Sequence, residues 1–204
     1  MSSQTQTAGI ILAAGASVRF GQLKQLTRLR GKYLVEWVLD AALKSRLDIV
    51  VLVLGHEYQS ILQALGAKAR HPQLEVVINH RYREGQSSSL KAGLNSVRQE
   101  YSSVMYLLGD QPMINSNTIN HLLDQFRQSE KDLCVPVCKK KGGNPTVFKR
   151  PIYKELMMID GDIGARDIIA KNAQRVLYAK IKDPLCFFDI DSPEDLKKLQ
   201  DLIP

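Results

Sequence analysis

The sequence predicts one α/β domain in which a mostly parallel β-sheet is covered by helices on both faces. Short apolar runs of strand length alternate along the chain with amphipathic segments of helix length. The 204 residues, of which 44% are hydrophobic and 24% charged, suit a single domain that buries a sizeable core. Strands that alternate with helices in this way are expected to pair in parallel through right-handed crossovers.

The first apolar run, from Ile10 to Leu12, predicts a short buried strand. The polar residues 1–7 before it are expected to be a frayed lead-in. Residues 13–17, Ala-Ala-Gly-Ala-Ser, follow the run, and their small side chains leave the backbone open to a ligand. An open α/β sheet binds its ligand at the carboxyl ends of its strands, where Arg19 and Lys24 add positive charge. Bare backbone N–H groups and two cations suit a polyphosphate.

Two common nucleotide-binding patterns are absent from this loop. There is no G-x-G-x-x-G, and the spacing of Gly15, Gly21 and Gln22 also fails the pattern G-x-x-x-x-G-K-[ST]. The sequence therefore argues against a hydride-transfer enzyme and against a P-loop NTPase.

The next elements follow from hydrophobic periodicity. It predicts a helix over about 34–45, a buried strand over 48–54, a helix over 57–66 and a strand over 74–79. Residues 83–90, Arg-Glu-Gly-Gln-Ser-Ser-Ser-Leu, then form a turn into a further helix. One serine satisfies an N-cap, so three consecutive serines exceed the structural requirement.

A second polar turn follows the strand predicted over 103–108. Its residues are Gly-Asp-Gln-Pro, and Asp110 is well placed to hold a hard cation over phosphates, although this is also ordinary turn chemistry. A helix over 115–128 and a strand over 132–137 come next. Residues 139–145, which include three lysines, are expected to form a hairpin or lid, and 146–148 to return into the sheet.

The last third of the chain holds two more polar clusters. After a helix over about 151–158, Asp162 is expected to cap a helix start, with Arg166 behind it. Near the C-terminus, Ser192 and Pro193 have the character of an N-cap and a first helical residue. Asp189 and Asp191 alternate with apolar residues, so one of them should face the pocket.

The stretch from Leu12 to Lys24 resembles the signature loop of the MobA-like nucleotidyltransferases, in particular the molybdenum cofactor cytidylyltransferase branch. Four further motifs resemble that family and occur in its order: G-x-x-S-S-L-x-x-G-L from Gly85, G-D-Q-P from Gly109, G-D-x-G-A-R from Gly161 and D-I-D-S-P-E-D-L from Asp189. The resemblance runs from Gly9 to about Leu199. The sequence departs from the family at Phe20, where methionine is common, at Tyr33, where proline is frequent, and at Asn144, where histidine is usual.

The resemblance implies a Rossmann-like sheet of the nucleotide-diphospho-sugar transferase type and Mg²⁺-dependent transfer of CMP from CTP to the phosphate of molybdenum-bound molybdopterin. It implies that the nucleotide contacts Leu12, Ala13, Ala14, Gly15, Arg19, Lys24, Gly85, Ser88, Ser89 and Asp110. Arg19, Lys24 and Asp110 would be catalytic, Asp110 and Asp189 would hold the metal, and Asn144, Asp162 and Arg166 would contact the acceptor. Arg166 is equally able to pair with Asp162 or Asp167.

Alternatives from other classes are weaker. Two alternatives remain open. One is the same chemistry on a sugar phosphate or another small phosphate. The other is a non-catalytic molybdenum cofactor carrier, which is less favoured because a carrier has no need of two metal ligands. A molybdoenzyme that receives the product is a possible partner.

The net charge of +7 is dispersed with few interleaved aromatics, which argues against nucleic acid. No signal peptide or membrane span is expected, so we predict a cytoplasmic protein without a membrane partner.

Overall fold

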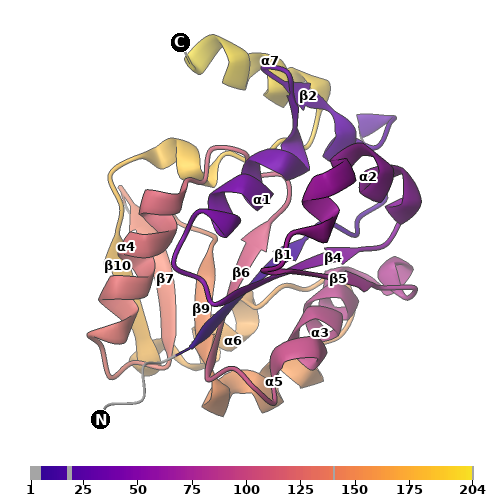
Figure 1. The fold of residues 1–204 in the computed structure, drawn as a ribbon. Helices are drawn as coiled ribbons and strands as arrows, with labels where there is room; N and C mark the ends of the chain where they lie inside the picture. Colours follow the sequence, from indigo (N-terminus) through magenta and orange to yellow (C-terminus); the bar gives the residue numbers. More distant parts are fainter. Residues whose placement is uncertain (1–5, 18–19, 140, 204) are drawn as a thin grey trace.

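The structure is a computed structural model that describes residues 6–17, 20–139 and 141–203. Its main sheet has the strand order β10-β7-β9-β6-β1-β4-β5, with β8 paired to β7 (Figure 1). The strands span Thr7–Leu12 (β1), Ile49–Leu54 (β4), Leu74–Ile78 (β5), Ser103–Leu108 (β6), Leu133–Cys138 (β7), Lys141–Gly142 (β8), Thr146–Lys149 (β9) and Val176–Lys180 (β10). A separate small hairpin consists of Arg28–Leu29 (β2) and Lys32–Tyr33 (β3).

Most neighbouring strands run parallel, as the strand–helix alternation predicts. β1 pairs in parallel with β4 and β6, β4 with β5, and β7 with β10. One exception is β9, which runs antiparallel between β6 and β7, and it confirms that residues 146–148 return into the sheet. The short β8 pairs antiparallel with β7, so residues 139–145 contain the predicted hairpin.

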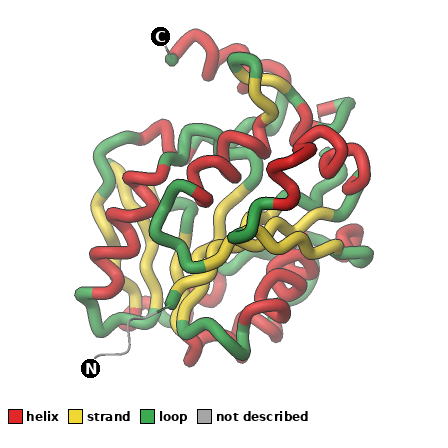
Figure 2. Tube along the Cα trace, in the orientation of Figure 1, coloured by secondary structure: helices red, strands yellow, loops and turns green. Residues whose placement is uncertain are grey.

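Helices cover both faces of this sheet (Figure 2). One face packs against Leu34–Leu43 (α1), Tyr58–Leu65 (α2) and Ser116–Arg127 (α4). The other packs against Gln86–Val97 (α3), Tyr153–Met158 (α5) and Arg166–Lys171 (α6). Adjacent residues of β1 serve the two cores, since Ile11 belongs to the first and Ile10 to the second. This two-sided burial explains why the strands are continuous apolar runs.

Helix α3 approaches the sheet closely at one glycine. A Cβ atom on Gly93 would overlap the side chains of Ile10 and Val53. The glycine in the motif that begins at Gly85 therefore has a packing role. It lets the helix that carries the serine cluster lie directly over β1 and β4.

The C-terminal helix, Pro193–Leu202 (α7), lies away from the sheet and beside the β2–β3 hairpin (Figure 1). Its capping was predicted correctly: Ser192 Oγ accepts from Asp195 N at 3.2 Å, and Pro193 is the first helical residue. A small apolar cluster joins helix and hairpin and consists of Phe20, Leu29, Leu34, Ile190 and Leu199. The cluster thus fixes the chain just before α7, where Asp189 and Asp191 lie.

Three local expectations differ from the structure. Strand β1 already begins at Thr7, which is buried and donates from its backbone N to Asp48 Oδ2 at 2.7 Å, so it is not part of a frayed lead-in. Asp162 does not cap the helix that follows it, because α6 begins at Arg166 with Ala165 at its N-cap. The periodicity also did not reveal the β2–β3 hairpin or β10.

Candidate active site

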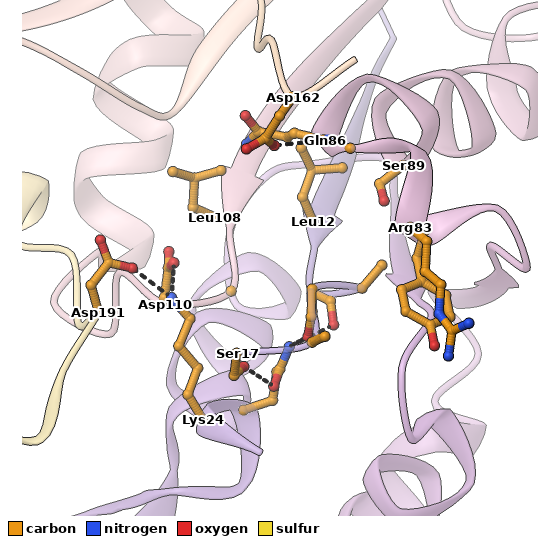
Figure 3. Close-up of a pocket in the computed structure, with 18 of the residues that line it drawn as sticks. Leu12, Ser17, Lys24, Arg83, Gln86, Ser89, Leu108, Asp110, Asp162 and Asp191 are labelled. Atoms are coloured by element: carbon orange, nitrogen blue, oxygen red, sulfur yellow. Dashed lines mark hydrogen bonds and ion pairs between the residues drawn. The ribbon is translucent and has the colours of Figure 1, made fainter. Parts of the chain in front are cut away.

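A cavity of about 690 Å³ opens at the carboxyl ends of β1 and β6. This is the edge of the sheet where an open α/β fold binds ligands. Most of its lining comes from the loop after β1, the 3₁₀ turn Lys24–Leu26 (η2), the turn into α3 and the turn after β6, and the segments before α6 and α7 add one aspartate each (Figure 3). Its lining residues are Leu12, Ala13, Ala14, Gly15, Ala16, Ser17, Lys24, Gln25, Tyr82, Arg83, Glu84, Gly85, Gln86, Ser89, Leu108, Gly109, Asp110, Asp162 and Asp191.

The loop after β1 rests on two glycines at the ends of neighbouring strands. A Cβ atom on Gly109 would come within 2.9 Å of Ala13 Cβ, and one on Gly55 within 2.8 Å of the Ala14 carbonyl oxygen. Ala13 and Ala14 are themselves only 4% and 3% exposed. Their side chains are therefore small because they pack beneath the loop, while Gly15 and Ala16 are exposed on its outer side.

Lys24 brings the ends of two distant segments together. Its Nζ donates to Asp110 Oδ2 at 2.7 Å and to Asp191 Oδ1 at 2.9 Å (Figure 3). Burial by itself would lower the pKa of Lys24, but the two carboxylates outweigh that effect and raise it. The ammonium group therefore stays charged at neutral pH.

The two carboxylate oxygens of Asp110 differ in their hydrogen bonding. Oδ2 accepts from Lys24, whereas Oδ1 is buried and has no hydrogen-bond partner among the described residues. A buried carboxylate oxygen without a donor is costly unless a ligand or ion meets it. Oxygen donors of this kind suit a hard divalent cation. Within the described part of the chain, no group of three or more His, Cys, Asp or Glu side chains forms a complete metal site, so a cation here would also need oxygens from substrate.

The segment before α7 is tied to the same turn. Ile190 N donates to the Asp110 carbonyl oxygen at 3.0 Å, which places Asp189 and Asp191 on either side of this contact. Asp191 lines the cavity, whereas Asp189 is more exposed and accepts from Gln111 Nε2 at 2.8 Å. Partial desolvation, and then the negative charge of Asp110, raise the pKa of Asp189. Both aspartates therefore lie close to Asp110.

The serine cluster lies at the opposite side of the cavity, at the start of α3. Asn79 is 5% exposed, and its Nδ2 donates to Ser88 Oγ at 2.9 Å and to Ser89 Oγ at 3.0 Å. Ser88 Oγ donates onward to the Gly85 carbonyl oxygen at 2.8 Å. Ser89 and Gly85 line the cavity, whereas Ser88 lines a neighbouring groove. Two of the three nucleotide contacts predicted for this segment, Gly85 and Ser89, are thus at the cavity wall.

The predicted acceptor residues are not brought together. Asp162 lines the cavity, but its Oδ1 accepts from Gln86 N at 3.2 Å, so it caps the first turn of α3. Arg166 and Asn144 are not among the residues that line the cavity. Arg166 is the exposed first residue of α6, and Asn144 Oδ1 accepts from Thr146 Oγ1 at 3.3 Å. Arg19 lies outside the described residues. The acceptor roles of Asn144, Asp162 and Arg166 stay predictions.

Comparison with known proteins settles the family. The model of the MobA-like NTP transferase domain matches residues 9–176, which is most of the chain. This chain belongs to the MobA-like NTP transferase family. A nucleotidyltransferase family and its α/β fold are thus shown.

Three curated relatives carry different names. "Purine catabolism protein PucB" of Bacillus subtilis (strain 168) is 30% identical and covers 92% of each chain. "Nicotine blue oxidoreductase" of Paenarthrobacter nicotinovorans is 28% identical over 94% of this chain and 95% of the relative. "Probable molybdenum cofactor guanylyltransferase" of Thermococcus sibiricus (strain DSM 12597 / MM 739) is 26% identical over 94% of this chain and 96% of the relative. Membership of the MobA-like family therefore does not by itself fix the substrate.

A solved structure shares the fold over nearly the whole chain. The crystal structure of Rv0371c from Mycobacterium tuberculosis H37Rv superimposes with a TM-score of 0.84 at 25% identity, over 98% of this chain and 99% of that one. A second structure of that protein, in complex with manganese, has a TM-score of 0.82 at 24% identity, over 98% of this chain and 100% of that one.

Sequence reasoning missed several residues of this MobA-like site, and four of them have amide side chains. Gln25 and Gln86 line the cavity, Asn79 holds the serine hydroxyls, and Gln111 holds Asp189. Three of them directly adjoin a predicted residue or motif position, namely Lys24, Gly85 and Asp110. That adjacency was the available signal.

Among the described residues, no helix is long and apolar enough to cross a membrane.

Proposed function

We propose that this chain transfers CMP from CTP to the phosphate of molybdenum-bound molybdopterin and releases pyrophosphate. The observation that carries nucleotidyl transfer is Lys24, held between Asp110 and Asp191 beside an open small-residue loop. An oxygen of the acceptor phosphate attacks the α-phosphorus of CTP, the bond to the bridging oxygen breaks, and pyrophosphate leaves in line. Such a reaction requires positioning and charge neutralisation more than covalent work by the protein.

Each proposed residue has one task in this step. The amides of residues 14–16, together with Arg19, bind the β- and γ-phosphates, and Lys24 stabilises the charge on the α-phosphate oxygens. The Ala13 N–H, which the sequence also suggested, is excluded because it donates to the Val53 carbonyl oxygen at 2.9 Å. Gly85, Ser88 and Ser89 face the nucleotide base. An acceptor phosphate is already ionised, so no general base is required, and no nucleotidylated protein should appear by intact mass spectrometry.

The metal proposed for this site is Mg²⁺, with Asp110 as its first ligand. The unpartnered Oδ1 atom of Asp110 supports this assignment. A divalent cation held there would neutralise negative charge on the phosphate oxygens. Asp189 stays the predicted second ligand, and Asp191 is a second candidate because it faces the cavity and shares Lys24 with Asp110. A relative of known fold that is solved with manganese also supports a divalent metal here.

The choice of base and acceptor rests on resemblance. Ala14 and the uncharged Gln22-Leu23 favour the cytidylyl branch, whereas one relative is named a guanylyltransferase. The molybdenum cofactor as acceptor is favoured by that relative's name. Cytoplasmic location and delivery of the product to a molybdoenzyme belong to the same proposal.

Pyrophosphate release is the test. It is measured with Mg²⁺ and each of CTP, GTP, ATP and UTP, with and without the molybdenum cofactor. We expect release from CTP only when the cofactor is present. Cofactor-dependent release from GTP instead would correct the base, whereas a nucleotide that binds without cofactor-dependent release would redirect the acceptor to a sugar phosphate or another small phosphate, or indicate a carrier.

Asp110→Ala tests the metal assignment within the same assay. The variant should lose turnover while its far-UV circular dichroism stays that of the wild type, because the side chain lies at a cavity wall and not in an apolar core. Asp189→Asn and Asp191→Asn then separate the two candidates for second ligand by Mn²⁺ titration. An active Asp110→Ala protein would show that the metal lies elsewhere.

A further inference from the structure

Gln25 follows Lys24 in η2 and extends beneath the loop after β1. It is 4% exposed, and both ends of its side-chain amide are used. Nε2 donates to the carbonyl oxygens of Ala13 at 3.1 Å and Gly15 at 2.9 Å, and Oε1 accepts from Ser17 Oγ at 3.1 Å. One buried amide thus makes three contacts across a five-residue loop.

These contacts determine which side of the loop carries its carbonyl groups. In a trans peptide the C=O of one residue and the N–H of the next point in opposite directions. Because the Ala13 and Gly15 carbonyls face Gln25, the N–H groups of Ala14 and Ala16 point away from it. The Ala14 carbonyl is also occupied, by His56 N at 3.1 Å.

The three consecutive carbonyl groups of residues 13–15 are therefore bound by the protein itself. A carbonyl that turned toward a phosphate would repel it, whereas an N–H group would bind it. Ser17 adopts the left-handed conformation with φ 54°, which is uncommon for a residue with a side chain, and its hydroxyl is held by the same glutamine. The loop is thus held in one particular arrangement.

We propose that Gln25 is the positioning residue of the polyphosphate-binding loop, which it keeps with its carbonyls inward and its amides toward the β- and γ-phosphates. The inference rests on the proposed nucleotide-binding role of residues 14–16. Only a side chain with two donors on one nitrogen and an acceptor beside it can make these three contacts, so an amide is required.

Gln25→Met and Gln25→Glu test this role. Methionine removes the hydrogen bonds without adding charge, and glutamate replaces the two donors with an acceptor that faces two carbonyls. Binding of CTP, inorganic pyrophosphate and CMP is measured by calorimetry with Mg²⁺. We expect affinity for CTP and pyrophosphate to fall by about tenfold or more in both variants, and affinity for CMP to stay within about twofold of wild type.

Gln63→Glu is the matched control. Gln63 is exposed on α2, far along the chain from the loop, and it does not line the cavity. It should bind all three ligands as the wild type does. A purely structural role for Gln25 would weaken CMP as much as CTP, and that result would overturn the inference, as would wild-type binding of pyrophosphate by Gln25→Met.

A measurement on the wild type keeps the test independent of variant folding. In ¹H–¹⁵N spectra, pyrophosphate should shift the Ala14 and Ala16 amide signals, because these N–H groups contact it. Pyrophosphate that binds without moving either signal would overturn the role of Gln25 but leave nucleotide binding intact. If the wild type binds neither nucleotide nor pyrophosphate, the proposed function itself is wrong and the inference falls with it.

Discussion

The ammonium group of Lys24 lies between two carboxylates that come from distant parts of the chain, Asp110 after β6 and Asp191 before α7. These contacts raise the pKa of Lys24 against the effect of burial. They also mean that a cation already sits beside the oxygens proposed to hold metal. In the proposed reaction Lys24 would therefore have two effects: it would stabilise charge on the phosphate and compete with a divalent ion for the carboxylates.

Lys24→Met separates these two effects. Turnover should fall by about 10²–10³-fold because charge on the α-phosphate loses its stabilising cation. Affinity for Mn²⁺ in the absence of nucleotide should rise, since Asp110 and Asp191 lose their ammonium partner. Both are measurable, by pyrophosphate release and by Mn²⁺ titration. Lys44→Met, at the exposed end of α1, should change neither, and a fully active Lys24→Met enzyme would contradict the assignment.

At the scale of elements, α1 is joined to its neighbours by a network of ion pairs. Asp40 of α1 accepts from Lys32 Nζ at 2.6 Å and pairs with Lys68 Nζ at 2.9 Å. Lys68 Nζ also donates to Glu36 Oε1 at 3.0 Å. The network connects the β2–β3 hairpin, α1 and the turn after α2. Desolvation alone would raise the pKa of Asp40, but the two lysines outweigh it and lower that pKa below its usual value of 3.8.

This lowered pKa predicts a pH-dependent stability. The folded state binds the Asp40 proton more weakly than the unfolded state, so the stabilisation is present above about pH 4 and is lost as the pH falls through the folded-state pKa. Asp40→Asn should therefore lower the free energy of unfolding by about 1 kcal/mol at pH 7. The difference from wild type should shrink below pH 3.8, the usual pKa of this carboxyl. Urea unfolding of the variant and the wild type, at pH 7 and below pH 3.8, measures this difference in the free energy of unfolding.

The control for this prediction is Asp201→Asn, which removes an exposed carboxylate from α7. It should leave the free energy of unfolding unchanged at either pH. An Asp40→Asn protein that loses as much stability below pH 3.8 as at pH 7 would show that Asp40 acts through packing and not through charge.

For the molecule as a whole, the C-terminal helix packs against residues 20–34 close to the site. Leu199 and Ile190 are fully buried against Phe20, Leu29 and Leu34. Arg30 Nη2 also donates to the Ile203 carbonyl oxygen at 2.7 Å. Asp191 lies between this cluster and Lys24. Packing far from the cavity therefore sets the position of one of its carboxylates.

Leu199→Ala should lower the free energy of unfolding by about 2–4 kcal/mol, because it leaves a cavity in a fully buried apolar cluster. It should also weaken Mn²⁺ binding, since Asp191 loses part of its support. Leu202→Ala is the matched control on the same helix, where the side chain is 57% exposed. Thermal unfolding and Mn²⁺ titration give the two readouts. Equal losses for both variants would refute a specific role of the cluster.

The sequence predicted most of the sheet because its strands are buried on both faces and appear as continuous apolar runs. It missed the β2–β3 hairpin and β10, since two-residue strands have no periodicity and β10, Val176–Lys180, mixes exposed and buried positions. In the site, Lys24 and Asp110 were found from their motifs. Gln25 was missed because a glutamine in a turn gives no signal until its three partners are known.

By itself, the sequence determined the α/β class, the small-residue loop after the first strand and the polar turns at the strand ends, because these depend on local composition and spacing. Tertiary structure decided which polar groups meet. Asp191 reaches Lys24 across 167 positions, Asp162 caps α3 and not its own helix, and Ala13 and Ala14 pack on Gly109 and Gly55. Contacts between distant segments are set by how the whole chain closes, which no local pattern encodes.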